Sequence, residues 1–305
     1  MNHPQRQPWR RIDGVLLLDK PAGMTSNAAL QKARRLFNAA KAGHTGTLDP
    51  MATGLLSLCF GEATKFAGGL LAADKRYAAT VRLGVRTDTA DAEGRILETR
   101  PVAVTREQLE AVLARFRGDI LQVPPMHSAL KRDGRPLYEY ARKGIVLERA
   151  PRAVTIHALD LRSFEGDYIE FDVDCSKGTY VRTLAQDIGE ALGCGGHLTA
   201  LRRTRIGSLH LEEAFTLEAL EAMTPEAREA LLQPADALLT ALPRLDLDAD
   251  ATQRFGHGQT VPVLQGPVAG QLRIYADDGR FLGLGRAAPD GQVAPARLVA
   301  APIEK

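Results

Sequence analysis

A single acidic residue, Asp49, lies in a segment whose composition suits a catalytic loop. Between Gly43 and Gly54 the chain has three glycines, three threonines and this one acid. Glycine permits positive φ angles and close approach of a ligand to the backbone, and threonine hydroxyls can orient a carboxylate. Pro50 biases Asp49 toward an extended backbone. The segment could therefore present a reactive carboxylate, although by composition alone a single aspartate in a loop is more often a turn residue.

Several other chemistries do not match the sequence. The phosphate-loop pattern G-x-x-x-x-G-K-[ST] is absent, and neither H-E-x-x-H nor a paired Cys/His spacing suggests zinc. Cys59, Cys175 and Cys194 form no C-x-x-C pair, and their odd number argues against a disulfide framework. Small buried side chains in a reducing, cytosolic compartment explain them best. We therefore expect no metal and no cofactor.

The size and composition of the chain indicate a globular protein of two domains. It has 305 residues, of which 45% are hydrophobic and 25% charged, with a formal net charge of +2. No apolar stretch approaches the ~18 residues that a membrane-spanning helix needs. The apolar run Val15 to Leu18 is too short for a signal peptide and is followed by Asp19 and Lys20. We expect a soluble, cytoplasmic protein that does not bind membranes.

The elements around the candidate loop can be predicted from apolar spacing. Val15 to Leu18 indicates a buried strand that ends at the turn Lys20 to Gly23. Ser26 can cap a helix, because apolar residues recur after it at helical spacing. A short apolar strand, Leu55 to Phe60, follows the loop, and Thr64 to Leu71 is expected to be helical. The loop should thus connect a helix to a buried strand.

The middle of the chain alternates between strands and helices. Tyr77 to Leu83 has one apolar face and one polar face, which is typical of a strand. Thr105 opens a capping box for a helix. Val154 to Phe164 and Tyr168 to Cys175 are predicted to be two strands, followed by a helix near Tyr180 to Leu192. These patterns predict a mixed α/β fold.

The last part of the chain differs in its pattern of residues. Residues 211–242 are acidic and are predicted to be helical. From Asp250 onward the sequence changes to strands and glycine turns, and Asp277-Asp278-Gly279 marks a hairpin. We expect a small β domain there.

Positive charge is concentrated in one long segment. Residues 126–152 carry seven basic and three acidic side chains. A loop of this length in a compact domain is usually functional, although a solvated surface loop would have a similar composition. A second basic group is formed by Arg202, Arg203 and Arg205.

Five ordered motifs together resemble the bacterial TruB-type tRNA pseudouridine-55 synthases. The segment around Asp49 is similar to the catalytic motif of that family. The other four motifs are Gly14 to Ser26, Lys75 to Tyr77, Val123 to Lys131, and Cys175 to Leu184. The region around Phe281 to Gly283 resembles the small C-terminal PUA-like domain of the family. The resemblance spans about residues 12 to 303.

The resemblance implies a fold, domains and an activity. The fold would be the pseudouridine synthase fold, with a large, mainly antiparallel sheet and a small C-terminal PUA-like β domain. The implied divisions are a disordered tail at 1–11, a catalytic domain at 12–245 with a basic RNA-gripping loop at 124–152, and a PUA-like RNA-binding domain at 250–305. The reaction would be isomerisation of uridine to pseudouridine at position 55 in the T-arm of tRNA.

The resemblance also implies which side chains act on the nucleoside. Asp49 would be the nucleophile, and whether it attacks C1′, adds to C6 or removes the C2′ proton is left open by the sequence. Arg182 would pair with it and keep it ionised. Tyr77 would stack on the extruded base and is also implied to take the C5 proton. Without the motifs, a surface helix arginine and a core tyrosine would be the simpler interpretations.

The remaining implied site residues bind substrate or RNA. His44 would fill the place of the extruded base, Tyr180 and Leu201 would line the pocket, and Lys20 would lie near the active site or support the loop. The residues expected to contact RNA phosphates are basic: Lys131, Arg132, Arg142, Lys143 and Arg202.

Other functions have to be weighed against this one. The protein could be an RNA-binding or tRNA-folding chaperone, an activity that can coexist with catalysis. A hydrolase would usually bring a second acid or a metal set, and Asp88 and Asp91 lie in a loop that looks merely polar. A guide-RNA-dependent enzyme would usually carry a longer C-terminal region than one ending soon after Pro302. We therefore expect tRNA as the partner, no guide RNA, and a monomer.

Overall fold

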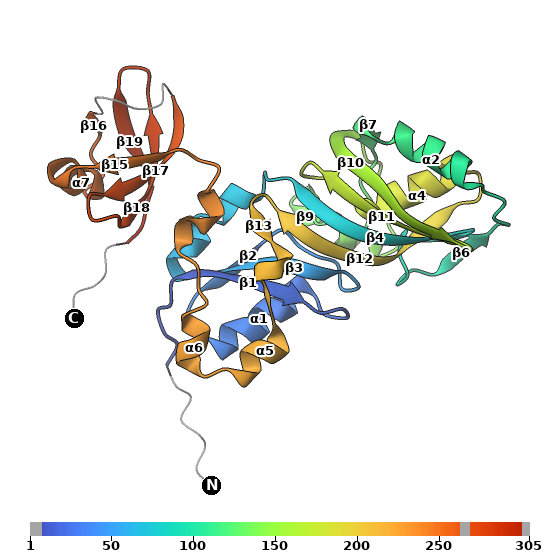
Figure 1. Ribbon diagram of the computed structural model, residues 1–305, viewed down its shortest axis with the longest axis horizontal. Helices are drawn as coiled ribbons and strands as arrows, with labels where there is room; N and C mark the ends of the chain where they lie inside the picture. Colours follow the sequence, from blue (N-terminus) through green and yellow to red (C-terminus); the bar gives the residue numbers. More distant parts are fainter. Residues whose placement is uncertain (1–7, 263–268, 301–305) are drawn as a thin grey trace, which may run out of the picture.

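The computed structural model describes residues 8–262 and 269–300, which form two β-sheet domains (Figure 1). The larger domain contains a ten-stranded sheet. Its strands are β1 (Gly14–Lys20), β2 (Ala42–Thr45), β3 (Thr53–Phe60), β4 (Lys75–Leu83), β7 (Gly118–Gln122), β10 (Arg152–Glu165), β11 (Tyr168–Cys175), β12 (Gly196–Ile206), β13 (Leu209–His210) and β14 (Phe215–Thr216). Among the described residues, no helix is long and apolar enough to cross a bilayer.

The large sheet is mainly antiparallel. Its strand order is β14-β1-β3-β12-β4-β11-β10-β7, with β2 paired to β3 and β13 paired to β12. The β1–β14 and β3–β12 pairs are parallel, and the other pairs of this sheet are antiparallel. The mixed α/β class and the mainly antiparallel sheet predicted above are therefore confirmed.

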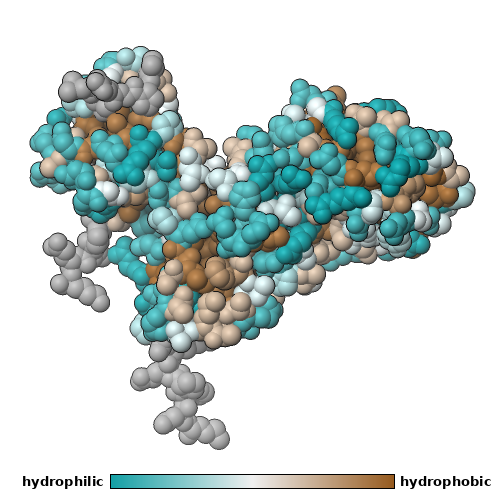
Figure 2. Space-filling model, viewed as in Figure 1, coloured by the Kyte–Doolittle hydropathy of each residue, from teal (hydrophilic) through white to brown (hydrophobic). Residues whose placement is uncertain are grey.

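The helices pack on one face of this sheet. The main ones are α1 (Ser26–Leu36), α2 (Arg106–Arg115) and α4 (Val181–Ala191). The apolar face predicted for the strand after Tyr77 is buried, with Val81 and Leu83 fully enclosed. These side chains form one core with Leu184 and Ile188 of α4. The opposite face of β4, β10 and β11 carries hydrophilic side chains (Figure 2), so the sheet presents one charged surface to solvent.

Some local predictions need correction. Thr25, not Ser26, caps α1, because the Thr25 hydroxyl accepts a hydrogen bond from Ala28 N at 3.1 Å. The helix expected at residues 64–71 is two 3₁₀ turns, Gly61–Lys65 and Ala67–Leu70. Residues 211–242 hold only short helices. These are α5 (Leu217–Ala222), α6 (Pro225–Glu229) and the 3₁₀ turns Leu211–Glu213 and Ala235–Leu239. Prolines 225 and 234 each interrupt a continuous helix there.

The basic segment at 124–152 contains secondary structure of its own. A two-stranded hairpin, β8 (Lys131–Arg132) with β9 (Arg135–Pro136), leads into the short helix α3 (Leu137–Ala141). A second hairpin, β5 (Val85–Thr87) with β6 (Ile96–Thr99), encloses the loop that carries Asp91. The capping box expected at Thr105 is present.

The expected N-terminal tail is only partly described. Residues 1–7 lie outside the described residues. Arg10 bridges to Ala39 and its guanidinium donates to Glu229, so residues next to the tail's end lie against the domain.

The C-terminal domain is a five-stranded sheet that begins earlier than predicted. Its strands are β15 (Arg244–Leu247), β16 (Val261–Pro262), β17 (Gly270–Ala276), β18 (Phe281–Ala287) and β19 (Gln292–Leu298), with helix α7 (Ala249–Gly256). Because β15 pairs with β17, this sheet starts at Arg244 rather than at residue 250. The hairpin predicted at residues 277–279 connects β17 to β18 and is confirmed. The Phe66 and Phe281 rings, 5.2 Å apart, join the two domains.

Strand β12 approaches β3 most closely at Gly54, where the two halves of the large sheet join. A Cβ added to Gly54 would lie 2.3 Å from the Arg203 carbonyl oxygen, and Gly54 has a φ of +97°. Only glycine fits this crossing, because backbone atoms cannot move aside as a flexible side chain can.

We predict that Gly54→Ala lowers the free energy of unfolding by about 3 kcal/mol or more, since it combines backbone strain with overpacking. Gly118→Ala is the matched control. Gly118 has a φ of +84° with nothing within 4 Å of the added Cβ, so it should cost only about 1–2 kcal/mol. Urea unfolding of both variants measures the difference. Equal losses would mean that β3 and β12 can separate without penalty.

Candidate active site

The structure brings Asp49 and Arg182 together. Arg182 lies in the first turn of α4 and is 5% exposed. Its Nε lies 3.0 Å from Asp49 Oδ2, and its Nη2 lies 3.5 Å from Asp49 Oδ1. The helix holds the guanidinium in place, while the aspartate side chain remains 37% exposed. The carboxylate therefore has one side fixed by a cation and another open to a ligand.

A second carboxylate, Asp91, also binds Arg182. Arg182 Nη1 lies 3.1 Å from Asp91 Oδ2 and donates to Thr89 O at 3.2 Å. Asp91 is 3% exposed, and its Oδ1 accepts from Glu93 N at 3.1 Å. The interpretation of this loop as merely polar was therefore wrong. The β5–β6 hairpin and a β-bridge between Asp91 and Leu198 place this loop beside Arg182. The local sequence does not indicate either contact.

A further hydrogen bond of Arg182 connects the basic segment to the site. Arg182 Nη2 donates to His127 O at 2.7 Å. Just before this segment, the Gln122 side chain accepts from Tyr180 N at 3.0 Å and donates to Tyr180 O at 3.3 Å. Tyr180, predicted to line the pocket, thus lies at the start of α4 with its backbone held by β7. Three separate chain segments meet at one guanidinium.

The backbone on both sides of Asp49 is anchored. The Ser26 hydroxyl accepts from Leu48 N at 2.8 Å and donates to Leu48 O at 3.0 Å. Lys20 is fully buried, and its Nζ donates to Pro50 O at 3.3 Å. The same ammonium donates to Met24 O at 2.6 Å and Pro21 O at 2.8 Å. Of the two interpretations of Lys20, these contacts favour support of the loop.

Burial and charge oppose each other at these groups. Burial raises the pKa of Asp49 above its ordinary value; the Arg182 charge lowers it and the Asp91 charge raises it. Burial lowers the pKa of Lys20 to about 8, opposed by the attraction of Asp49. A group whose charged form is disfavoured by its surroundings is typical of a reactive site.

The other predicted pocket residues lie around the same loop. Tyr77 is half-buried on β4, and burial raises its pKa. His44 lies on β2, where burial lowers its pKa and its Nδ1 has no hydrogen-bond partner among the described residues. A neutral imidazole is consistent with packing against a base rather than with carrying charge.

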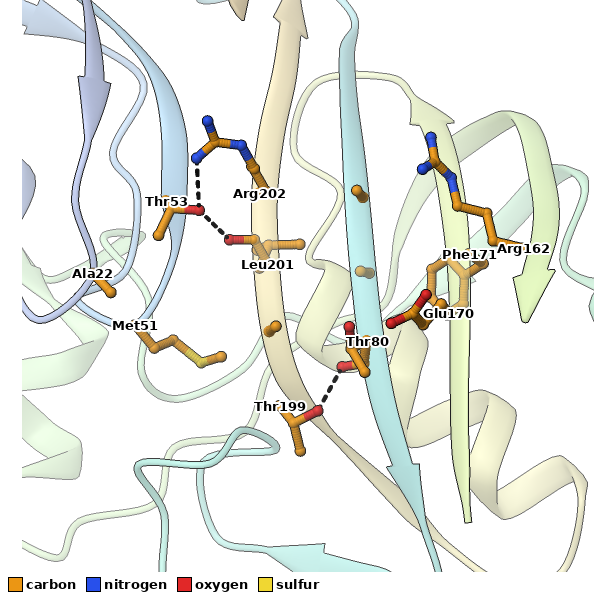
Figure 3. A pocket seen from close by; sticks show the side chains of 13 residues that line it. Ala22, Met51, Thr53, Thr80, Arg162, Glu170, Phe171, Thr199, Leu201 and Arg202 are labelled. Atoms are coloured by element: carbon orange, nitrogen blue, oxygen red, sulfur yellow. Dashed lines mark hydrogen bonds between the residues drawn. The ribbon is translucent and has the colours of Figure 1, made fainter. Parts of the chain in front are cut away.

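A cleft of about 450 Å³ lies on the charged face of the sheet (Figure 3). Leu201 and Arg202, both predicted site residues, line it together with Met51 and Thr53 from the end of the Asp49 loop. Its floor consists of small side chains: Ala22, Ala78, Thr80, Thr199 and Ala200. Small side chains leave room for a bulky ligand to approach the sheet.

The residues predicted to contact RNA lie on the basic segment and at the cleft. Lys131, Arg132, Arg142 and Lys143 are exposed on the basic segment. Arg202 reaches the cleft, and its guanidinium pairs with Asp19 at 2.6 Å. Further arginines on the same face are paired with aspartates: Arg76 and Arg162 with Asp172, and Arg205 with Asp174.

Comparison with known proteins identifies the family. Residues 34–181 match the model of the N-terminal domain of TruB family pseudouridylate synthases. Residues 182–240 match the tRNA pseudouridylate synthase B C-terminal domain, and residues 243–299 match a further C-terminal model of pseudouridine synthase II TruB. The chain is 62% identical, over 96% of its length and 95% of the relative, to tRNA pseudouridine synthase B of Aromatoleum aromaticum.

The chain belongs to the TruB family of pseudouridine synthases. The synthase of the same name from Ralstonia pickettii is 60% identical, over 97% of each chain. The resemblance stated above and the enzyme class it implied are thus confirmed.

Two solved structures share the fold. A Cbf5-Nop10-Gar1 complex matches with a TM-score of 0.70 and 28% identity, over 91% of this chain and 79% of that one. An H/ACA RNP bound to a substrate RNA containing 2′-deoxyuridine matches with a TM-score of 0.71 and 25% identity, over 95% of this chain and 85% of that one. The predicted pseudouridine synthase fold with a PUA-like C-terminal domain is confirmed.

The charge of Asp91 should control the pH dependence of this TruB-family site. The rate of pseudouridine formation should fall as pH drops through the pKa of Asp49, which burial raises above its ordinary value. Asp91→Asn removes a charge that raises this pKa, so the acid limb should move to lower pH. The plateau rate should fall as well, because Arg182 loses one of its two carboxylates.

Single-turnover rates measured across the acid range test this expectation. Asp88→Asn is the matched control from the same loop, because Asp88 pairs with Arg95 instead of Arg182. An acid limb that moves equally in both variants, or only in the control, would contradict the assignment.

Proposed function

We propose that this protein converts uridine to pseudouridine at position 55 in the T-arm of tRNA, with Asp49 as the nucleophile. The observation that carries the proposal is the Asp49 carboxylate, which is held by the buried Arg182 and whose side chain is still 37% exposed. The names of the relatives, tRNA pseudouridine synthase B, support the substrate class. The reaction exchanges the N1–C1′ bond for a C5–C1′ bond and releases the C5 proton.

The geometry supports a division of labour in this reaction. Arg182 orients the carboxylate and stabilises its ionised form, so Asp49 can act on an electron-poor sugar or base carbon. Tyr77 stacks on the base and relays the C5 proton, its hydroxyl oxygen taking up this proton as the hydroxyl gives up its own. Tyr180 and Leu201 close the walls of the pocket around the freed uracil.

The target uridine must leave its stack to reach Asp49. Extrusion of a base costs a few kcal/mol, and the pocket has to recover this cost. We assign His44 to the vacated place in the stack, in keeping with its disfavoured positive charge. The residues of the catalytic loop would then contact the sugar of the extruded nucleoside.

The basic segment at 124–152 supplies contacts to the RNA backbone. Its hydrogen bond from Arg182 to His127 O connects RNA binding to the catalytic carboxylate. Phosphate contacts fix register and orientation without reading sequence. The C-terminal β domain extends the same footprint along the tRNA.

We also propose the oligomeric state and the compartment in which the protein acts. Asp49, Arg182 and Tyr77 come from one chain, so a monomer can act alone on tRNA without a guide RNA. We place the reaction in the cytoplasm, where three free, buried cysteines suit a reducing environment.

The decisive variant is Asp49→Asn, tested on a T-arm stem-loop that carries 5-tritiated uridine. Wild-type protein should release tritium, and Asp49→Asn should release less than about one part in 10⁴ of that rate, since the nucleophile is lost. The fold should survive: ionised Asp49 destabilises the folded state because its folded pKa is raised.

Two control measurements show whether Asp49→Asn is folded and still binds RNA. Thermal unfolding should show Asp49→Asn to be at least as stable as wild type at neutral pH, and RNA binding should be retained. Tight binding by both proteins without tritium release from either would favour an RNA-folding chaperone over an isomerase.

The basic segment should contribute electrostatic affinity. Replacing Lys131, Arg132, Arg142 and Lys143 by alanine should weaken binding at low salt. The slope of log K against log salt should become shallower by about one unit for each phosphate that is no longer neutralised. Binding titrations over a salt series measure the slope, and Arg95→Ala, an exposed arginine on the β5–β6 hairpin, is the control. An unchanged slope would place the RNA elsewhere.

A further inference from the structure

Arg203 is a fully buried arginine with no role in the reaction as described so far. It is 1% exposed, while its neighbour Arg202 faces the cleft. Burial lowers the pKa of Arg203, and within the described part of the chain only Tyr77 opposes that effect. No carboxylate balances its charge there. A cation isolated from water is costly in a core, so its contacts should explain why it is present.

The guanidinium of Arg203 bonds to both ends of the catalytic loop. Its Nη2 donates to Gly46 O at 3.0 Å, before Asp49, and its Nε donates to Leu55 O at 2.7 Å, just after the loop. A Cβ on Gly46 would lie 3.5 Å from Arg203 Nη1, so the loop backbone packs directly on the guanidinium. One side chain thus fixes the distance between the two ends of the loop.

The same guanidinium also neighbours Tyr77. Arg203 and Tyr77 are cross-strand partners on β12 and β4, so their side chains extend from the same face of the sheet. The positive charge of Arg203 lowers the pKa of the Tyr77 hydroxyl and opposes the effect of its burial. An arginine can only donate, so it is the Tyr77 oxygen that this guanidinium can stabilise.

We propose that Arg203 is a positioning residue for the isomerisation, holding the Asp49 loop and the Tyr77 hydroxyl in one fixed arrangement from inside the core. The inference rests on the function proposed above. The planar fork of arginine donates to the two loop carbonyls in fixed directions while its charge stays beside Tyr77, and a lysine ammonium cannot reproduce this geometry.

The arrangement gives the buried charge an electrostatic task. Burial raises the pKa of Tyr77, and the Arg203 charge lowers it. The unbalanced cation thus stabilises negative charge on the Tyr77 oxygen and makes this oxygen a better hydrogen-bonding partner for the reacting base. A purely structural arginine would stabilise the fold without acting through Tyr77.

The test compares Arg203→Lys and Arg203→Met with Arg228→Met. Arg228 is a matched control, because it also donates to backbone carbonyls of two segments, Met223 and Leu36, where α6 meets the end of α1. Single-turnover pseudouridine formation and RNA affinity are measured on a T-arm stem-loop. Tyrosine titration is followed by ¹⁹F NMR after 3-fluorotyrosine incorporation, with the Tyr77 signal assigned by Tyr77→Phe.

We expect Arg203→Lys to slow the single-turnover step about 10- to 100-fold, as befits a hydrogen bond to a charged group. RNA affinity should stay within about threefold of wild type, and the Tyr77 signal should titrate at higher pH. In the Tyr77→Phe background the same substitution should cost less than about threefold, because the two residues act together. Arg228→Met should change neither the rate nor the titration.

Two results would overturn the proposal. One is an unchanged Tyr77 titration in Arg203→Lys. The other is an equal rate loss with and without the Tyr77 hydroxyl. Where Arg203→Met does not fold, the lysine variant decides both points. Absence of pseudouridine formation by wild type would instead refute the proposed function, and the Tyr77 titration would still report on its coupling to Arg203.

Discussion

The active site depends on one guanidinium shared between two carboxylates. Arg182 is nearly sealed from water and contacts Asp49 and Asp91 through different nitrogens. Arg182 and Asp91 are both nearly sealed from water, and removing one partner from a buried ion pair strands a charge at a cost of about 3–5 kcal/mol, so these two residues hold each other in place. Asp91 fixes the arginine from inside the domain, which leaves Asp49 as the carboxylate whose side chain is partly exposed. Of the two aspartates that bind Arg182, Asp91 is thus structural and Asp49 is the one available to react.

The catalytic loop is held by contacts to its backbone. Ser26 bonds to Leu48, Lys20 to Pro50, and Arg203 to the two ends of the loop. Lys20 and Arg203 are cations that donate to carbonyls, and both are buried. This scaffold holds the loop by its backbone and so keeps the Asp49 carboxylate near its productive geometry. The scaffold contains no acidic side chain that would compete with Asp49 for a ligand. The charge of Lys20 also lowers the pKa of Asp49 and so offsets part of the burial penalty on its ionised form.

Contacts between distant segments give the site its link to RNA binding. Arg182 bonds to His127 O, and the Gln122 side chain bonds to the backbone of Tyr180, so hydrogen bonds connect the base of the basic segment to the start of α4. The charged sheet face next to the cleft pairs arginines with aspartates. These ion pairs hold the guanidinium groups in fixed positions. A phosphate group that replaces one of the carboxylates would therefore bind a guanidinium that is already ordered.

The sequence alone determined the family, the mixed α/β class, the strand that carries Tyr77 and the pairing of Asp49 with Arg182. The class and the strand rest on apolar periodicity, which is a local property, whereas the family and the pairing of Asp49 with Arg182 rest on the resemblance of five ordered motifs to a known family. Tertiary structure alone decided the roles of Asp91 and Arg203, because a loop acid and one arginine of a basic cluster look like solvated side chains until strands from distant parts of the chain enclose them. It also decided that Thr25 rather than Ser26 caps α1, since the Ser26 hydroxyl is engaged by Leu48 across the fold. Burial and hydrogen bonding between remote segments have no signature in local spacing, and these are what turn charged residues into a site.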